Sequence, residues 1–296
     1  MNAAIPYRND WHPSDALPDM DEQEFARWAA LIESRTGMSM PAARRSFLVT
    51  SVGLRMREAG FHTHEDYYRY LTSGVRGNVE WAALVDRLTV HETHFLRDPR
   101  ALEFLTQQIF PERMAARAPD DAVHVWSAGC STGEEAYTLA MVLDRFLRTA
   151  GCPQNFGVTG TDISLQSLAT ARAGLYGQRR ARELPDDYLT RYFETVEGGR
   201  LRVAQRLRQR VCFAQMNIMD AGRLGSQEAD VIYCQNLLIY FDRGRRQAIA
   251  DGLVHHLRPG GVLVLGAGEL VGWQRADMER VRNRWDVLAY RRRDEL

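Results

Sequence analysis

The chain has no lysine, no closely spaced cysteine pair, no long apolar segment and no net charge. Its 38 basic residues are all arginine and balance 38 acidic residues. This balance argues against a general nucleic-acid binder, which needs a positive excess to neutralise phosphates. The cysteines have no C-x-x-C spacing, so neither a zinc site nor a disulfide framework is indicated. No stretch approaches the roughly 20 apolar residues of a membrane span, and residues 1–15 lack an apolar signal region. We therefore expect a cytoplasmic protein without membrane insertion.

Residue periodicity divides the 296 residues into two expected domains and two other segments. Residues 1–20, rich in proline and aspartate, predict a loose leader. From residue 21 to 88 the pattern is helical: Phe25, Trp28, Ala29 and Ile32 recur at helical spacing, and Gly37 supplies a stop. This predicts an all-helical N-terminal domain over 21–88. Residues 89–118 are interpreted as a linker that carries one site motif, and 119–296 as the second domain.

The second domain alternates short apolar runs with helical stretches of ten or more residues. The runs are VHVWSAG, FGVTGTD, DVIYCQN and GVLVLGAG. Such alternation is typical of an α/β fold in which a parallel sheet is wound with helices. The segment RYFETVEGGRLRV interrupts this pattern with two strand-like pieces around a glycine pair, which predicts a β-hairpin.

The first strand-to-helix turn reads V-W-S-A-G-C-S-T-G-E-E. Gly129 leaves the strand and Gly133 opens the helix, so that backbone can approach a ligand closely. The turn is not a dinucleotide fingerprint, because Glu134 and Glu135 would repel a pyrophosphate at the helix N-terminus. Carboxylates there suit a cationic nucleoside without phosphates, such as S-adenosylmethionine. Alternatively, one glutamate only complements the helix dipole, which contributes about 0.3–1 kcal/mol.

Polar residues also follow the next three strands. Asp162 at the end of FGVTGTD is a candidate for binding ribose hydroxyls, or else a helix N-cap. Asn217 and Ile218 could contact the edge and face of an adenine. The strand DVIYCQN and its continuation place three further polar side chains at the same carboxyl edge: Gln235, Asn236 and Tyr240. Their convergence on one crevice favours a binding site over unrelated local roles.

Taken in order, these motifs resemble the CheR family of chemotaxis-receptor methyltransferases. The resemblance rests on T-V-H-E-T-H-F-L-R-D-P-R, W-S-A-G-C-S-T-G-E-E-A-Y, G-T-D-I-S, N-I-M-D, C-Q-N-L-L-I-Y-F-D and R-P-G-G, and extends from about residue 22 to 290. It implies a Rossmann-like, class I S-adenosylmethionine-dependent methyltransferase domain with a small inserted antiparallel β-subdomain, here about 188–210. An all-α N-terminal domain precedes it.

The resemblance also implies an activity: methyl transfer from S-adenosylmethionine to glutamates in the cytoplasmic domains of chemotaxis receptors, which gives methyl esters and S-adenosylhomocysteine. The residues nearest the transferred methyl would be Arg97 and Tyr240. The implied cofactor-binding set is His91, Thr93, Arg97, Gly129, Glu134, Asp162, Asn217, Ile218, Gln235 and Asn236. Three positions depart from the family pattern, namely His91 for Asn, Leu96 for Phe and Gln235 for Arg, and we expect them to retune cofactor affinity.

The chemistry can be derived from the residues as well. A glutamate is ionised at pH 7, so it can attack a sulfonium methyl without a general base. The enzyme must hold the reactants in line and exclude water. The planar fork of Arg97 suits the orientation of an incoming carboxylate, although Arg97 could instead form a structural ion pair with Asp98 or Glu92. His91 and His94 lie three residues apart, which does not fit the H-E-x-x-H spacing of a zinc site.

Two features concern partners. Arg44, Arg45 and Arg55 lie in an acid-free stretch and would share a helix face; the resemblance implies that this face docks acidic receptor helices, while a solvated face explains the charges equally well. Members of the family that dock on a receptor's C-terminal pentapeptide have a longer glycine-containing loop, so the resemblance and the short E-G-G turn together imply the type that acts without the pentapeptide. Nothing in the sequence requires more than a monomer.

Two other functions remain open. One is methylation of nucleic acid or of an amide nitrogen, which the absence of an N-P-P-Y or D-P-P-Y motif disfavours. The other is an interaction module that binds S-adenosylmethionine in a signalling complex without methyl transfer.

Overall fold

The computed structural model describes residues 17–116, 118, 121–152, 155–223, 225 and 228–294. Most of the expected leader, residues 1–16, lies outside this part of the chain. The fold divides into two compact units, with the boundary between Val90 and His91. Within the described part of the chain, no helix is both long and apolar enough to span a membrane.

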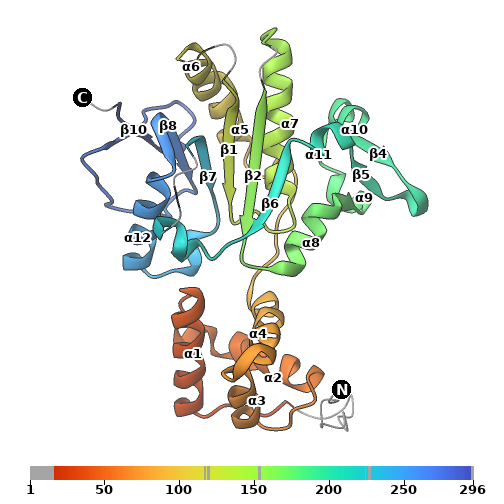
Figure 1. The fold of residues 1–296 in the computed structure, drawn as a ribbon, viewed down its shortest axis with the longest axis vertical. Helices are drawn as coiled ribbons and strands as arrows, with labels where there is room; N and C mark the ends of the chain where they lie inside the picture. The colour runs from red at the N-terminus through yellow and green to blue at the C-terminus, as the bar shows by residue number, and fades with distance from the viewer. Residues whose placement is uncertain are drawn as a thin grey trace. The chain divides into compact units, whose positions relative to one another are not determined.

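The first unit is helical, as its periodicity predicts (Figure 1). Its first helix begins at a capping box, in which the Asp21 carboxylate accepts from the Glu24 amide at 2.7 Å and the Glu24 carboxylate accepts from the Asp21 amide at 3.2 Å. It ends at Gly37, whose φ of 77° suits glycine. Trp28 and Ile32 are buried beneath it. The helices of this unit are α1 (Glu22–Thr36), a 3-10 turn (Ala42–Arg44), α2 (Arg45–Glu58), α3 (His64–Leu71) and α4 (Gly74–Leu88).

The second unit is built on a seven-stranded sheet in the order β6-β2-β1-β7-β8-β10-β9. Strands β6, β2, β1, β7 and β8 run parallel, whereas β10 is antiparallel to both β8 and β9. Every residue of β7 is buried, as expected of a strand covered on both faces. The strands of this sheet are β1 (Val123–Ala128), β2 (Phe156–Asp162), β6 (Val211–Gln215), β7 (Ala229–Cys234), β8 (Leu257–Leu265), β9 (Met278–Arg280) and β10 (Leu288–Arg292).

Helices cover this sheet in the doubly wound manner predicted. Helices α7 and α8 pack on β2 and β6, and α12 packs on β8. In the second unit, the described α-helices of eight or more residues are α7 (Glu134–Thr149), α8 (Leu165–Ala173) and α12 (Arg243–Val254). Shorter helical segments are α5 (Pro99–Phe104), the π-helical η2 (Leu105–Ile109), α6 (Phe110–Ala115), α9 (Gln178–Ala181), α10 (Asp186–Tyr192), α11 (Gln205–Arg208) and three 3-10 turns, η3 (Glu197–Gly199), η4 (Ile218–Arg223) and η5 (Leu238–Tyr240).

Residues 89–118, which the sequence predicts to be a linker, are mostly helical in the structure. Their larger part forms α5, η2 and α6, whose apolar residues join the core of the second unit. On α6, Arg113 also donates to the fully buried carboxylate of Asp230, at 3.3 Å. These contacts are made to residues far along the chain, so composition alone does not indicate them.

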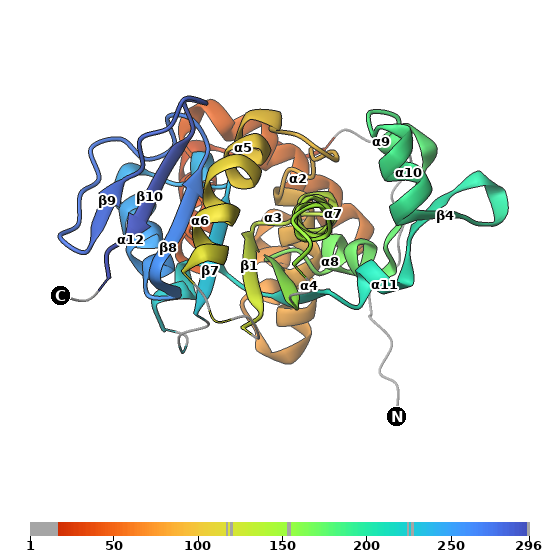
Figure 2. The same cartoon turned by 90° about the horizontal axis from the view of Figure 1, so that it is seen from above.

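The small antiparallel sheet is present, and it begins earlier than the predicted boundaries of 188–210. Its order is β3-β5-β4, formed by β3 (Leu175–Tyr176), β4 (Phe193–Thr195) and β5 (Leu201–Val203). Figures 1 and 2 both show β4 on the opposite side of the large sheet from β10, and Figure 1 shows β6 as the strand of the large sheet on the β4 side. In β5, Val203 is buried and Arg202 is exposed, so the strand has one buried and one solvated face.

Candidate active site

The glycine turn after β1 is closely packed on both sides. Gly129 has a φ of 81°, and a Cβ there would lie 3.0 Å from Cδ2 of Leu237, in the loop after β7. Its amide donates to the Thr161 carbonyl at 2.8 Å, which holds the turn against the end of β2. Gly133, with a φ of 96°, would place a Cβ 2.7 Å from Cβ of Ala171. Both glycines are therefore required by backbone conformation and by close approach.

Replacing Gly133 with alanine should destabilise the second unit. A non-glycine residue at this φ is strained and would also collide with α8, so we expect a loss of about 2 kcal/mol or more. The measurement is urea unfolding, with Gly177→Ala as control, because Gly177 has a φ of −72° and no atom within 4 Å of the added Cβ. Equal stability of the two variants would contradict the argument.

Asp162 ends β2 as predicted, and it is not a helix cap. Its carboxylate accepts from the amides of Ser131, at 2.8 Å, and Ser164, at 2.9 Å, whereas Ser164 itself caps α8. Burial raises the pKa of Asp162; these amide bonds and the nearby His91 ring oppose the shift. His91 is in turn held by a 2.8 Å hydrogen bond between its Nδ1 and Oγ of Ser167. The carboxylate is thus fixed at the sheet edge, where it could accept from ribose hydroxyls.

Three of the predicted residues, Thr93, Arg97 and Gln235, line one small cavity of about 20 Å³. This is room for about one water molecule. Arg97 is exposed, and its Nη1 donates to the main-chain carbonyl of Glu92 at 2.8 Å. The other lining residues are His94, Asp98, Leu102, Glu135, Thr138, Leu139 and Tyr233.

Gln235 occupies the position where the family pattern has arginine. Its Oε1 accepts from the Tyr233 hydroxyl at 3.0 Å, and its Nε2 donates to the Asp98 carboxylate at 3.1 Å. The neutral amide therefore bridges the end of β7 to the segment that carries Arg97. The amide of Gln235 is neutral, so this hydrogen bond does not balance the negative charge of Asp98. An arginine at position 235 would balance that charge.

The two neighbouring glutamates of the glycine turn point to different surroundings. Glu134 is fully buried; it accepts from Oγ1 of Thr132 at 2.6 Å and pairs with Arg180 of α9. The structure therefore does not bring Glu134 to the cavity. Glu135 lines it instead, and accepts from Oγ of Ser127 at 2.6 Å. The sequence drew attention to both residues, and the implied cofactor-binding set contained Glu134, which pairs with Arg180 of α9 near the small subdomain.

Burial raises the pKa of Glu135 to about 8, and the Ser127 hydrogen bond and the charge of Arg97 oppose the shift. The negative charges of Glu269 and Asp162 add to the rise. Glu135 is thus a half-buried residue whose carboxyl group carries a proton at neutral pH and would ionise when a cation is placed beside it.

The remaining predicted residues follow β6 and β7 at the same edge of the sheet. Asn217 accepts from the Met219 amide at 3.1 Å, and Ile218 is buried. Asn236 is exposed, with a left-handed φ of 56°. Tyr240 is half-buried at the end of η5. None of these four lines the small cavity.

The His91–His94 pair forms no metal centre in the described residues, which contain no group of three or more potential ligands. His91 bonds Ser167, and Nδ1 of His94 lies 3.4 Å from the Glu183 carboxylate.

In the first unit, the three arginines expected to dock a partner differ in their surroundings. Arg55 forms a two-pronged ion pair with Glu80, with both N–O distances at 2.7 Å, and also bonds Glu58. Arg45 donates to the Met20 carbonyl, and Arg44 precedes α2 and lies 4.9 Å from the centre of the Phe47 ring. Arg55 therefore serves the packing of α2 on α4, and a docking role stays a prediction for Arg44 and Arg45.

Replacing Arg55 with methionine should destabilise the first unit. Glu80 is only 8% exposed, so its carboxylate would remain buried without the guanidinium and would keep the hydrogen bond that it accepts from the Tyr67 hydroxyl at 2.8 Å. We expect a loss of about 3 kcal/mol in urea unfolding. The control is Arg69→Met, since the Arg69 side chain is 70% exposed and its pair with Glu65 should contribute below about 1 kcal/mol. A small loss for Arg55→Met would show that the pair does not stabilise the unit.

A parallel sheet extended by the antiparallel β10, with fixed acidic side chains at its carboxyl edge, defines a class I S-adenosylmethionine-dependent methyltransferase fold. Sequence comparison then gives the family. The model of the CheR methyltransferase SAM-binding domain matches residues 91–287, and that of the CheR methyltransferase all-alpha domain matches residues 23–89. The chain belongs to the CheR methyltransferase family, and its cofactor is S-adenosylmethionine.

Similar proteins include two chemotaxis protein methyltransferases. That of Klebsiella aerogenes is 33% identical over 254 residues, which cover 84% of each chain. That of Escherichia coli is 32% identical over 253 residues, which cover 84% of this chain and 85% of the relative. A solved structure of the N-methyltransferase NodS from Bradyrhizobium japonicum with S-adenosylhomocysteine is 14% identical, with a TM-score of 0.37 and coverage of 78% of this chain and 98% of that one.

Proposed function

We propose that this protein transfers the methyl group of S-adenosylmethionine to glutamate side chains in the cytoplasmic domains of chemotaxis receptors. The observation that carries the proposal is the exposed guanidinium of Arg97, which lines the same cavity as the half-buried Glu135, in a protein of this family. The ionised carboxyl group of Glu135 would stabilise a cationic methyl donor, and the guanidinium of Arg97 would stabilise a methyl acceptor that is an anion. The chemotaxis methyltransferases similar to this chain support the pathway.

In this proposal some residues bind the cofactor and others orient the substrate carboxylate. Asp162 would accept hydrogen bonds from the ribose hydroxyls, and Asn217 and Ile218 would contact the adenine. Glu135, rather than Glu134, would face the amino group of the methionine moiety. Arg97 would orient the substrate carboxylate, with Tyr240 close to the transferred methyl group.

The reaction needs no general base on the protein. One oxygen of the ionised glutamate attacks the methyl carbon, the carbon–sulfur bond breaks, and its electron pair stays on sulfur. The products are a neutral methyl ester and S-adenosylhomocysteine. The enzyme accelerates methyl transfer by holding the carboxylate oxygen, the methyl carbon and the sulfur in line and by excluding water.

The test is transfer of label from S-adenosylmethionine to receptor cytoplasmic domains. We expect label that mild alkali releases, with methyl esters at specific glutamates by mass spectrometry. Alkali-stable label would indicate an amide or nucleic-acid methyltransferase. Binding of S-adenosylmethionine without any transfer to receptors would support the interaction module instead.

We further propose that the receptor's C-terminal pentapeptide is not required. The β4–β5 connection is short: Gly198 and Gly199 lie within the 3-10 turn η3, and the Val196 amide bonds the Arg200 carbonyl at 2.8 Å. Removing the pentapeptide from a receptor should leave its methylation rate unchanged. A large loss of rate would contradict this part of the proposal.

A further inference from the structure

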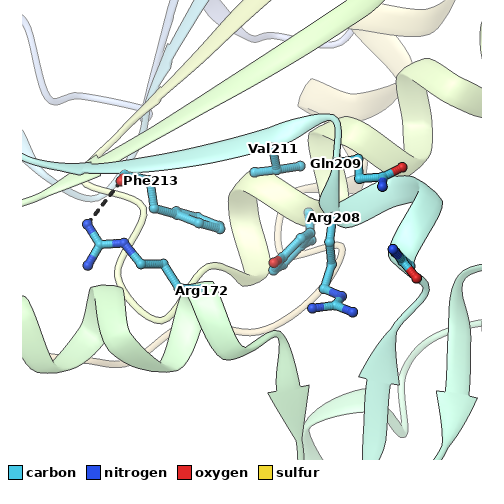
Figure 3. A pocket seen from close by; sticks show the side chains of 7 residues that line it. Arg172, Arg208, Gln209, Val211 and Phe213 are labelled. Carbon is cyan, nitrogen blue, oxygen red and sulfur yellow. Dashed lines mark hydrogen bonds between the residues drawn. The ribbon is translucent and has the colours of Figure 1, made fainter.

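A second and larger cavity lies at the β6 edge of the large sheet (Figure 3). Its volume is about 470 Å³, which falls within the usual range of about 300–1,000 Å³ for small-molecule sites. It shares no lining residue with the small cavity around Arg97. Its lining comes from α7, α8, β6 and the segment at α11, and consists of Tyr137, Arg172, Gln205, Arg208, Gln209, Val211 and Phe213.

The charge of this cavity is positive. Among the residues that the structure describes, two arginines line the cavity and no aspartate or glutamate does. Each guanidinium is anchored by one main-chain carbonyl: Nη2 of Arg172 donates to Phe213 at 3.0 Å, and Nε of Arg208 donates to Val203 at 3.0 Å. Because a guanidinium has five N–H donors, each anchored arginine keeps donors for an anion. The lining therefore offers fixed, bidentate partners of the kind that phosphate binds.

The other side chains offer a flat apolar surface and amide groups. The Phe213 ring extends from β6 into the cavity (Figure 3) and packs against the Tyr137 ring, with centroids 5.4 Å apart and planes at 66°. Aromatic rings and guanidinium planes stack on planar bases. Gln205 and Gln209 are exposed and lie one helical turn apart, so their amides can donate to and accept from the edge of a ring.

We propose that this cavity binds a small phosphate-bearing ligand with a planar ring, of the size of a purine nucleoside monophosphate. Arg208 holds the phosphate and Phe213 stacks on the ring, while the Arg172 guanidinium, directed to the Phe213 carbonyl and away from Arg208 (Figure 3), adds positive charge to the cavity. An extended acidic peptide fits less well, because the Phe213 carbonyl of the edge strand β6 is already bonded by Arg172 and is closed to strand addition. The site is separate from the methyl-transfer chemistry and does not depend on the identity of the methyl acceptor.

The test is calorimetric titration of the full-length protein with GMP and with AMP. Saturating S-adenosylhomocysteine is present throughout, so that the nucleotides cannot report binding at the cofactor site. We expect submillimolar dissociation constants for at least one nucleotide. Inorganic phosphate alone, and guanosine or adenosine alone, should bind at least tenfold more weakly, because each lacks half of the recognised chemistry.

Two matched variants locate the binding. Gln209→Glu introduces a negative charge into the lining and removes neither arginine–carbonyl bond, so nucleotide affinity should fall at least tenfold. Gln166→Glu places the same change on the exposed face of α8, outside the lining, and should leave affinity unchanged. Unaltered affinity for S-adenosylhomocysteine in both variants shows that they are folded.

Three results would overturn the proposal. They are no binding of either nucleotide at millimolar concentration, equal binding by the two variants, and tighter binding of a hexaglutamate peptide than of the nucleotides. The last result would assign the cavity to an acidic protein segment. None of them bears on whether receptor glutamates are methylated.

Discussion

The affinity for S-adenosylhomocysteine should rise roughly 50-fold between pH 6 and pH 8, if the ligand's ammonium group pairs with Glu135. The pKa of Glu135 is raised to about 8 by burial, so this group is protonated in the free protein at pH 6 and half ionised at pH 8. An ammonium beside it favours the ionised form, and binding must then release the proton. At pH values below the pKa of Glu135 in the free protein, each unit decrease in pH therefore lowers the affinity for S-adenosylhomocysteine by up to tenfold. Calorimetry in two buffers of different ionisation enthalpy would measure both the affinity and the released proton.

Two substitutions test which glutamate is responsible. Glu135→Gln cannot ionise, so its affinity should be weak and the part of the pH profile due to Glu135 should disappear. Glu134→Gln should keep the slope, because Glu134 pairs with Arg180 instead of lining the cavity. A slope retained in Glu135→Gln and lost in Glu134→Gln would assign the cofactor contact to Glu134.

Arg97→Ala should lower kcat by about 10²- to 10³-fold while the KM for S-adenosylmethionine changes less than tenfold. The magnitude is that of losing one preorganised donor at a reacting group. We expect turnover to fall more than cofactor affinity because Arg97 is exposed and lines the cavity, where its proposed role is to orient an incoming carboxylate. Steady-state kinetics with a receptor cytoplasmic domain, together with direct titration of the cofactor, would separate the two effects.

Arg97→Lys serves as the comparison, since it keeps the charge and loses the planar fork. Its turnover should lie between those of the wild-type protein and Arg97→Ala. The Arg97 side chain is exposed and donates to the main-chain carbonyl of Glu92, so neither variant should unfold the protein. Equal losses in turnover and in cofactor affinity would instead assign Arg97 chiefly to cofactor binding.

Local sequence signals predicted the parts of the fold that depend on neighbouring residues. The capped helix that ends at Gly37, the buried run of β7 and the turn through Gly129 each follow from residues a few positions apart. The placement of Asp162 at the end of β2 is also local, because the apolar run stops there. These helix ends, strands and strand ends could be predicted because the periodicity of apolar residues directly reflects which residues are buried.

Contacts between distant segments decided the rest. The choice between Glu134 and Glu135 depends on how α7 is rotated, and its residues from Ala136 to Leu143 are all buried, so periodicity did not mark one face. Arg55 looked like part of a charged face, yet its partner Glu80 lies 25 residues further along the chain.

The sequence by itself determined the order of elements, the α/β class and the strand ends that carry the residues proposed to bind the cofactor. Only the tertiary structure placed residues 99–115 in the core of the second unit, turned Glu135 into the small cavity and assembled the arginine-lined cavity from four separate segments. The physical reason is that periodicity reports which residues are buried, whereas side-chain partners depend on the packing of segments that are distant in sequence.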